Sequence, residues 1–182
     1  MVIDDVAAAA IETVLAHEGG YIDDPDDPGG ATNWGVSLRY LRAIGDLTLA
    51  DVDGDGDVDV DDIRQMTRAQ AAAIYHREWW VRYGYGQLPV PVSAKVMDLA
   101  VNMGASQAHR IAQRALRAVD ARQAVVDDGI IGPLTRRAIL SVDSGRLVTA
   151  IRSEAAGFYR GLVVAQPVRQ KWLRGWLNRA YY

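Results

Sequence analysis

Two carboxylates near the N-terminus are placed to do acid–base chemistry. Glu18 ends an apolar helical run, and Asp27 follows nine residues later in a segment rich in Gly and Pro. Cleavage of a glycosidic bond needs two carboxyl groups, one that holds a proton for the leaving oxygen and one that stays ionised. The glycines near both residues leave room for a bulky chain such as a polysaccharide to approach the backbone.

The environment predicted for Glu18 suits a general acid. Residues 3–17 place apolar side chains at i, i+3 and i+4 spacing, which predicts an amphipathic helix, and Gly19 and Gly20 end it. The partial negative charge at the C-terminus of a helix disfavours an ionised carboxylate, so Glu18 should keep its proton closer to neutral pH. A general acid has that property. The alternative is an exposed side chain at a helix end with no chemical role.

Several motifs resemble one known family. Glu18-Gly-Gly-Tyr21, followed by Asp27-Pro-Gly-Gly-Ala-Thr-Asn-Trp-Gly-Val36, resembles the signature of glycoside hydrolase family 108, whose members are N-acetylmuramidases found as phage endolysins and as bacterial proteins. Three later segments resemble the same family, namely Asp98–Gly104, Asp128–Thr135 and Leu173–Arg179. The resemblance covers residues 11–179 and implies a lysozyme-like fold in which Glu18 is the catalytic acid.

A second resemblance concerns the other catalytic residues. Glu18, Asp27 and Thr32 are similar in spacing to the Glu-Asp-Thr trio of T-even phage lysozymes, although the gap from Asp to Thr is one residue shorter. This implies that Asp27 orients water or stabilises positive charge on the sugar, and that Thr32 holds the water. Three other carboxylates lie in the same segment: Asp23, Asp24 and Asp26. Asp27 is preferred because it directly precedes Pro-Gly-Gly, the part that the family pattern fixes.

Three further residues are candidates for contact with substrate. Tyr21 and Trp34 flank the proposed acid, and sugar rings stack on aromatic faces, so both are expected to line the cleft. Asn102 lies in a later matched segment and would either hydrogen-bond an N-acetyl group or cap a helix. Trp172 and Trp176 share one face of the last predicted helix, and we expect them to pack in the core.

The chain should form a mainly α, lysozyme-like α+β fold: a helical bundle with a small β-hairpin. Helices are predicted at residues 38–44, 67–82, 93–103, 106–118, 133–140, 147–164 and 167–179, and a hairpin within 20–36. With 182 residues and 49% hydrophobic content, one catalytic domain over 1–182 is expected. Residues 105–182 resemble a C-terminal peptidoglycan-binding lobe integrated in that fold.

An acidic segment fits the pattern of a calcium loop. Seven of the 23 acidic residues lie between positions 51 and 62, with acids at loop positions one, three, five and twelve and Gly at position six. The expected ligands are the side chains of Asp51, Asp53, Asp55 and Asp62 and the backbone carbonyl of Asp57. Aspartate at position twelve resembles dockerins more than EF-hands. We expect an inserted EF-hand-like loop with a structural Ca²⁺; the alternative is an acidic surface loop without metal.

Charge and composition indicate where the protein acts and which kinds of partner it binds. The net charge is −3, but beyond Pro133 nine Lys and Arg face two acidic residues, which favours contact with an anionic wall or outer membrane. No motif for nucleic acid stands out, and a monomer is expected. The chain has no cysteine, signal peptide or transmembrane pattern. We therefore expect that the protein is made in a host cytoplasm and acts on peptidoglycan in the periplasm, which it reaches through a hole of the kind that a holin makes.

These observations predict a peptidoglycan hydrolase of the endolysin type that cleaves the β-1,4 bond between N-acetylmuramic acid and N-acetylglucosamine and lyses bacteria. No cofactor is expected in catalysis. One alternative is a lytic transglycosylase, which needs the Glu but no water-activating Asp. Another is a non-catalytic, calcium-dependent wall-binding module, which a second copy of the acidic loop would have favoured. Sequence spacing does not determine the distance between the two carboxyl groups, which decides whether a glycosidase inverts or retains the configuration of the cleaved sugar.

Overall fold

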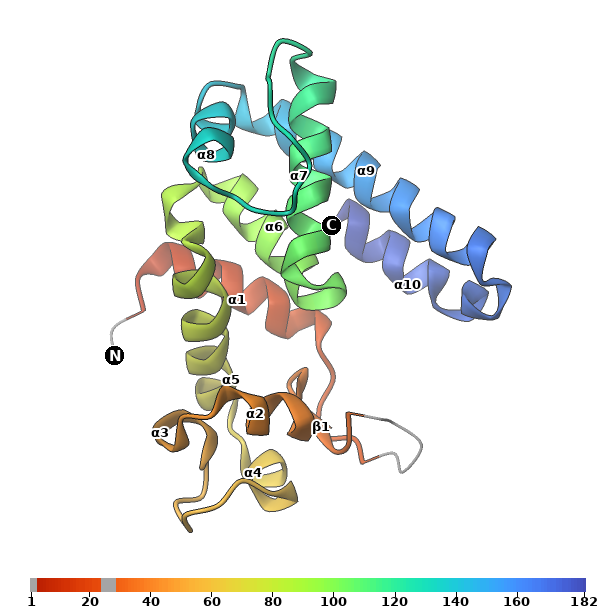
Figure 1. The fold of residues 1–182 in the computed structure, drawn as a ribbon. Coiled ribbons are helices and arrows are strands. Elements are labelled where there is room, and N and C mark those ends of the chain that lie inside the picture. The colour runs from red at the N-terminus through yellow and green to blue at the C-terminus, as the bar shows by residue number, and fades with distance from the viewer. Residues whose placement is uncertain (1–2, 24–28) are drawn as a thin grey trace. The chain divides into compact units, whose positions relative to one another are not determined.

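The computed structural model describes residues 3–23 and 29–182 (Figure 1). It divides into two compact units, Met1–Arg82 and Tyr83–Tyr182, and each is described by itself. Within the described residues the secondary structure is mainly helical, with one two-stranded antiparallel sheet. None of the helices in these ranges is long and apolar enough to cross a membrane.

The first unit begins with α1 (Asp5–His17), which Asp4 caps by accepting a hydrogen bond from the Ala7 N–H. The elements that follow are the strands β1 (Thr32–Asn33) and β2 (Val36–Ser37), the helices α2 (Leu38–Ile44), α3 (Leu47–Ala50), α4 (Val60–Gln65) and α5 (Arg68–Tyr75), and the π-helix η1 (His76–Val81). The apolar face of α1 packs against α5, and Ile11, Val14 and Ile74 are fully buried there. This packing fixes the C-terminal end of α1, where the hairpin also lies.

Most local predictions for this unit are confirmed. The helix α2 has the predicted bounds, and α5 begins at the predicted capping box, in which Thr67 and Gln70 bond each other's backbone N–H groups. The expected helix to Arg82 continues, but as a π-helix from His76. Its wider turn places Trp80 in the core, with 4% of its surface exposed, and leaves Trp79 half-buried.

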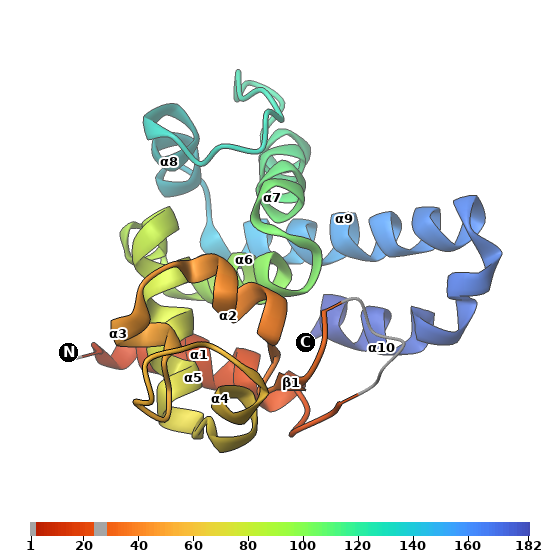
Figure 2. The same ribbon diagram turned by 60° about the horizontal axis from the view of Figure 1, so that its bottom comes forward.

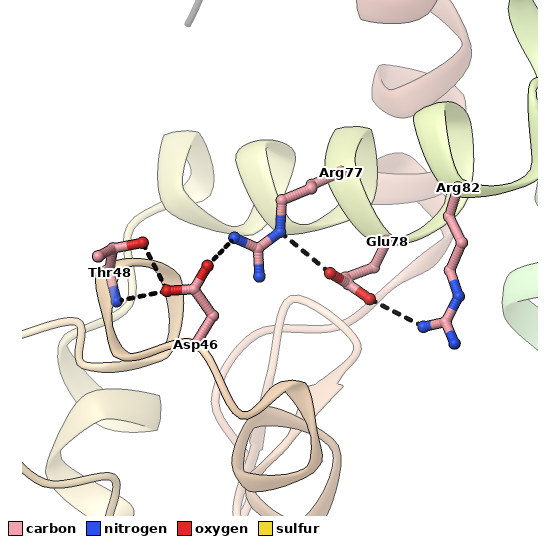
Figure 3. Close-up of polar contacts among 5 residues, drawn as sticks. All are labelled: Asp46, Thr48, Arg77, Glu78 and Arg82. Atoms are coloured by element: carbon pink, nitrogen blue, oxygen red, sulfur yellow. Dashed lines mark hydrogen bonds and ion pairs between the residues drawn. The ribbon is translucent and has the colours of Figure 1, made fainter.

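A chain of ion pairs joins the corner between α2 and α3 to the π-helix (Figure 3). Arg77 donates to Asp46 at 2.6 Å and to Glu78 at 3.0 Å, and Arg82 donates to the other oxygen of Glu78 at 3.0 Å. Hydrogen bonds from Thr48, followed by that from Arg77, hold the pKa of Asp46 below its ordinary value. Such partly exposed pairs contribute little energy each, so their main effect is to fix Glu78 and its neighbours in one arrangement.

The second unit contains seven helical segments, of which the first is a short 3-10 turn. They are η2 (Tyr85–Gln87), α6 (Val90–Met103), α7 (Ala105–Val119), α8 (Pro133–Leu140), α9 (Ser144–Ala165), η3 (Pro167–Arg169) and α10 (Gln170–Tyr181). Helix α9 packs along α6, α7 and α10. Two predictions were wrong here. Helix α7 begins at Ala105 with Gly104 as its N-cap, one residue before the predicted start at residue 106, and Trp172 is 48% exposed instead of packed in the core.

Two buried polar clusters hold the second unit together. Asp98, 1% exposed, accepts from Arg179 at 2.9 Å and from Lys95 at 3.2 Å, which attaches α10 to α6. In the other cluster His109 bonds the Tyr85 hydroxyl at 2.8 Å and the carbonyl oxygen of Gly129 at 2.9 Å. His109 is thus a buried residue with hydrogen-bond partners, as expected for a histidine that is not a metal ligand.

Candidate active site

Glu18 lies where the chain leaves α1. It is the C-cap residue, with an extended backbone (φ −88°, ψ 142°), and its N–H donates to the Val14 carbonyl oxygen at 3.2 Å. Gly19 then accepts a hydrogen bond from the Trp34 N–H at 3.1 Å. The helix end and the β-hairpin are therefore joined immediately after Glu18, whose side chain is half-buried.

The hairpin turns through only two residues, Trp34 and Gly35. Asn33 pairs with Val36, and both turn residues have positive φ, 52° for Trp34 and 76° for Gly35. Two positive φ values define the type I′ turn that suits the twist of a two-residue hairpin. Glycine adopts this conformation without strain, but a tryptophan there is an outlier that the surroundings must hold in place.

Trp34 is held from three directions besides the bond to Gly19. Its indole N–H donates to the carbonyl oxygen of Met66 at 3.2 Å, and its own carbonyl accepts from the Tyr75 hydroxyl at 2.9 Å. The guanidinium of Arg68 lies 6.0 Å from the ring centre. Strained backbone of this kind persists only where neighbours determine it, and it is concentrated at functional sites.

Gly35 touches the proposed acid. A Cβ atom on residue 35 would stand 2.5 Å from the Tyr75 hydroxyl oxygen and 2.7 Å from both Cγ and Oε2 of Glu18. Only a residue without a side chain fits between these two groups. Gly35 and Tyr75 are therefore parts of the site that sequence reasoning missed. The Trp-Gly pair inside Asn-Trp-Gly-Val was a local signal for the turn, but nothing local pointed to Tyr75.

An aromatic row continues from Tyr75. The Trp79 ring lies 5.1 Å from that of Tyr75 and 4.9 Å from that of Tyr40, centre to centre. Tyr40 and Trp79 are half-buried, so part of each ring meets solvent. Faces of this kind provide apolar surface for a sugar ring, and the row begins at the hydroxyl group that lies beside Glu18.

The other residues predicted for catalysis lie on or near the same hairpin. Thr32 and Ile22 form an antiparallel bridge, each N–H donating to the other's carbonyl oxygen at 2.8 Å, and the Thr32 hydroxyl donates to the Gly30 carbonyl at 3.3 Å. Tyr21 is exposed and donates to Asp23 at 3.3 Å. Backbone contacts thus bring Glu18, Thr32 and Trp34 together. Asp27, with its rivals Asp24 and Asp26, lies outside the described residues.

Asn102 belongs to the second unit. It is exposed near the end of α6, and its side-chain oxygen accepts a hydrogen bond from the Tyr159 hydroxyl at 2.6 Å. It caps no helix, since Gly104 occupies the N-cap position of α7. Of the two roles considered for this residue, recognition of an N-acetyl group remains as a prediction.

The acidic loop lies between α3 and α4. The one-turn helix α3 precedes it, where the sequence had indicated little helix, and α4 follows it. Carboxylate oxygens of three residues come within 4.8 Å of one another in each of two groups: Asp51, Asp53 and Asp55 form one, and Asp57, Asp59 and Asp62 the other. Asp51 accepts backbone hydrogen bonds from Gly54 at 2.7 Å and Gly56 at 3.0 Å, which folds the loop around it.

Repulsion between like charges is evident in this loop. The neighbouring Asp55 is the main cause that raises the pKa of Asp57, while partial burial and then Asp55 raise the pKa of Asp53. Asp62 differs from the others because it is buried and accepts backbone hydrogen bonds from Val52 and Asp59, both at 2.6 Å. Hard oxygen donors in two adjoining groups fit the ligand preference of calcium, and thiolate or imidazole ligands are absent from both groups.

The acidic loop is linked to the hairpin through α4. The Asp59 and Asp62 side chains form the capping box at the start of α4. At its other end, the carbonyl oxygens of Ile63 and Met66 accept from the Asn33 side chain at 2.9 and 3.3 Å. Asn33 is buried and immediately precedes the turn that contacts Glu18. A route of hydrogen bonds therefore runs from the acidic loop to the hairpin, whose turn contacts the candidate acid.

A mainly helical frame with a small hairpin is consistent with the lysozyme-like fold. The chain belongs to the glycosyl hydrolase 108 family, whose model matches residues 11–104. Residues 107–181 match a second model, described as a predicted peptidoglycan domain. The protein is therefore a glycoside hydrolase that acts on peptidoglycan. The first match ends at Gly104 and the second begins at residue 107, whereas the boundary between the compact units lies at Tyr83. Helix α6 therefore belongs to the first match but packs with α7 and α9 of the second match.

A solved structure supports the same fold. The structure of SagA from Brucella abortus is similar with a TM-score of 0.74 and 26% sequence identity, over 96% of this chain and 89% of that one. No curated protein matches the chain.

Proposed function

We propose that this enzyme hydrolyses the β-1,4 bond between N-acetylmuramic acid and N-acetylglucosamine in peptidoglycan. Membership of the family supports a glycosidase that acts on this polymer. The observation that carries the residue assignment is the position of Glu18: its carboxylate contacts the strained Trp34–Gly35 turn, beside the Tyr75 hydroxyl and the aromatic row that starts there.

Each residue has a defined task in this proposal. Glu18 gives its proton to the leaving glycosidic oxygen as the bond to the sugar breaks. Asp27, ionised, either takes a proton from the attacking water or stabilises the positive charge on the sugar, and Thr32 holds that water. The Thr32 hydroxyl donates to Gly30, which leaves its oxygen as an acceptor for the water. The aromatic faces of Tyr21, Trp34 and Trp79 and the amide of Asn102 are proposed to contact the glycan.

Substitution of Glu18 tests this assignment. Glu18→Gln keeps the size and the hydrogen-bonding capacity but cannot donate the proton, so clearing of purified peptidoglycan should slow by about 100-fold or more. Glu12→Gln is the matched control, because it makes the same change on the exposed face of the same helix. Activity close to wild type in a folded Glu18→Gln protein would refute the assignment.

Product analysis separates hydrolysis from the main alternative. Hydrolysis adds water and yields a reducing N-acetylmuramic acid end, whereas a lytic transglycosylase leaves a 1,6-anhydro end. Mass spectrometry of the released fragments distinguishes the two, since the products differ by one water. A full yield of anhydro ends would replace the muramidase proposal while keeping Glu18 as the acid.

For the biological role we propose that the enzyme lyses bacteria as a phage endolysin, reaching peptidoglycan in the periplasm through a holin-type lesion. The basic C-terminal third supports contact with anionic envelope components. Expression in the cytoplasm with and without a holin tests this: lysis should occur only when the holin is present. Lysis without a holin would contradict the proposed route.

We also propose that the acidic loop holds one Ca²⁺ in a structural role. The supporting observations are the register of the carboxylates, their mutual repulsion, and the two groups in which their oxygens converge. The ion would neutralise the repulsion and secure the start of α4. Isothermal titration of the metal-free protein with calcium should show one binding event, and magnesium should bind more weakly.

A further inference from the structure

The last two helices carry exposed apolar side chains near the turn that joins them. We define the α9–α10 tip as residues 160–174, which include the end of α9, the turn η3 and the start of α10. Val164 is 83% exposed, Val168 75% and Trp172 48%. They are distributed over all three parts of the tip. All three exposed apolar side chains thus fall within residues 164–172.

Cations surround these apolar side chains. The tip carries Arg160, Arg169, Lys171 and Arg174, and residues 155–182 contain no Asp or Glu. Within the part of the chain that the structure describes, none of the four takes part in an ion pair or a side-chain hydrogen bond. Lys171 lies 4.5 Å above the Trp172 ring, so charge and aromatic surface lie in direct contact.

The inner face of the same helices already has its partners. Trp176 stacks on Tyr159 with ring centres 5.3 Å apart, and Arg179 pairs with the buried Asp98. Helices α9 and α10 lie side by side in both ribbon views (Figure 2), as their packing contacts require. Trp172 joins this cluster with part of its ring, 5.9 Å from that of Trp176 centre to centre, and leaves 48% of its surface exposed. The exposed surfaces of Val164, Val168 and Trp172 are therefore available to a partner.

We propose that the α9–α10 tip binds the surface of an anionic phospholipid bilayer. The four cations match the negative lipid phosphates, and Val164, Val168 and Trp172 can enter the boundary between headgroups and acyl chains. Tryptophan prefers that depth in a membrane. A hydrated glycan strand offers no acyl phase for the two valines, so lipid is the partner that accounts for both halves of the surface. The binding is peripheral and uses none of the residues assigned to catalysis.

Vesicle co-sedimentation of the full chain tests the proposal. Wild-type protein should pellet with vesicles containing phosphatidylglycerol and remain soluble with pure phosphatidylcholine. Val164→Ser with Val168→Ser should weaken binding by about tenfold or more, because the apolar contribution is lost. Lys171→Gln with Arg174→Gln should weaken it by a similar factor and reduce its salt dependence.

Matched controls lie elsewhere in the second unit. Val126→Ser with Leu134→Ser removes two equally exposed apolar groups, and Arg137→Gln with Arg146→Gln removes two exposed cations. Both control pairs should bind vesicles like wild type. Melting curves verify that every variant is folded.

Two results would overturn the proposal. One is equal binding of the tip variants and the control variants, which would make the attraction a property of net charge. The other is binding to lipid-free peptidoglycan that depends on the tip while vesicle binding does not, which would identify the wall as the partner.

Discussion

The carboxylate of Glu18 lies against the backbone of Gly35, where any side chain on residue 35 would stand. The contact joins the end of the first helix to the hairpin turn. The Tyr75 hydroxyl also lies next to Gly35 and donates a hydrogen bond to the Trp34 carbonyl oxygen. The site thus depends on the absence of a side chain at one position, and this can be tested directly.

Gly35→Ala should reduce activity strongly, by about tenfold or more, because the new methyl group must displace Glu18 or Tyr75. Gly45→Ala is the matched control: Gly45 also has positive φ, 70°, but an added Cβ there meets nothing within 4 Å. Both variants carry similar backbone strain, and Gly35→Ala additionally loses the stability that the displaced neighbours provided. Initial rates on peptidoglycan, measured well below both melting temperatures, separate the two effects. Equal losses of activity would mean that the contact with Glu18 has no consequence.

Asp27→Asn should impair hydrolysis more than Asp24→Asn does, because only Asp27 is assigned the ionised role beside the sugar. The two changes are chemically identical and lie in the same segment, so each controls for the other. Rates of release of reducing ends measure the difference. Greater sensitivity at Asp24 would transfer the second carboxylate to that position.

Calcium should raise the melting temperature of the wild-type protein, since an ion that binds only the folded loop stabilises by mass action, by about 2.7 kcal/mol at 100 times its Kd. Asp53→Asn with Asp55→Asn should abolish this response. Asp5→Asn with Glu12→Gln, which removes the same charge outside the loop, should keep it. Chelation should leave hydrolysis in place well below the melting temperature. Activity that requires the metal, with unchanged stability, would instead place the ion in the reaction.

Stability should fall as the solution is acidified, and His109 should contribute to that fall. Burial lowers the pKa of His109 below its ordinary value of 6.5. The unfolded chain therefore takes up a proton near that value while the folded protein does not, so stability present at neutral pH is lost as the pH drops, by about 1.4 kcal/mol for each unit of pKa difference. Denaturant titrations from about pH 7 to pH 5 should show a shallower dependence for His109→Gln, and wild-type behaviour for His17→Gln.

A contrary result would be the same pH dependence in all three proteins. The hydrogen bonds explain why this is not expected. The Gly129 carbonyl can only accept, so Nδ1 of His109 carries the hydrogen and Nε2 accepts from the Tyr85 hydroxyl. A second proton on the ring would force the Tyr85 hydroxyl to change from donor to acceptor and would place a charge in a buried site.

The sequence predicted those features that depend on neighbouring residues. Helices α2 and α8 have their predicted bounds because a serine cap, a glycine stop and a first-turn proline are all local signals. The place of Glu18 at a helix end followed from the same kind of information, whereas the lysozyme-like class was implied by the resemblance to the family. The π-helix was not predicted, because it depends on the packing of Trp80 in the core and not on a local signal. Gly35 and Tyr75 are in contact although they are 40 residues apart in the sequence, and no local pattern predicts such a contact.

The route from the acidic loop to the hairpin ends on two backbone carbonyl groups, those of Ile63 and Met66. Every amino acid supplies such a group, whereas the donors, the Asn33 amide and the Trp34 indole, come from particular side chains. The position of the hairpin therefore depends on the path of this backbone and not on which side chains it carries. Apart from Asp62, the residues of α4 can change in any way that preserves the helix and its packing. A shift of the helix by a fraction of a turn would displace the hairpin that contacts Glu18 even if no residue near Glu18 were altered.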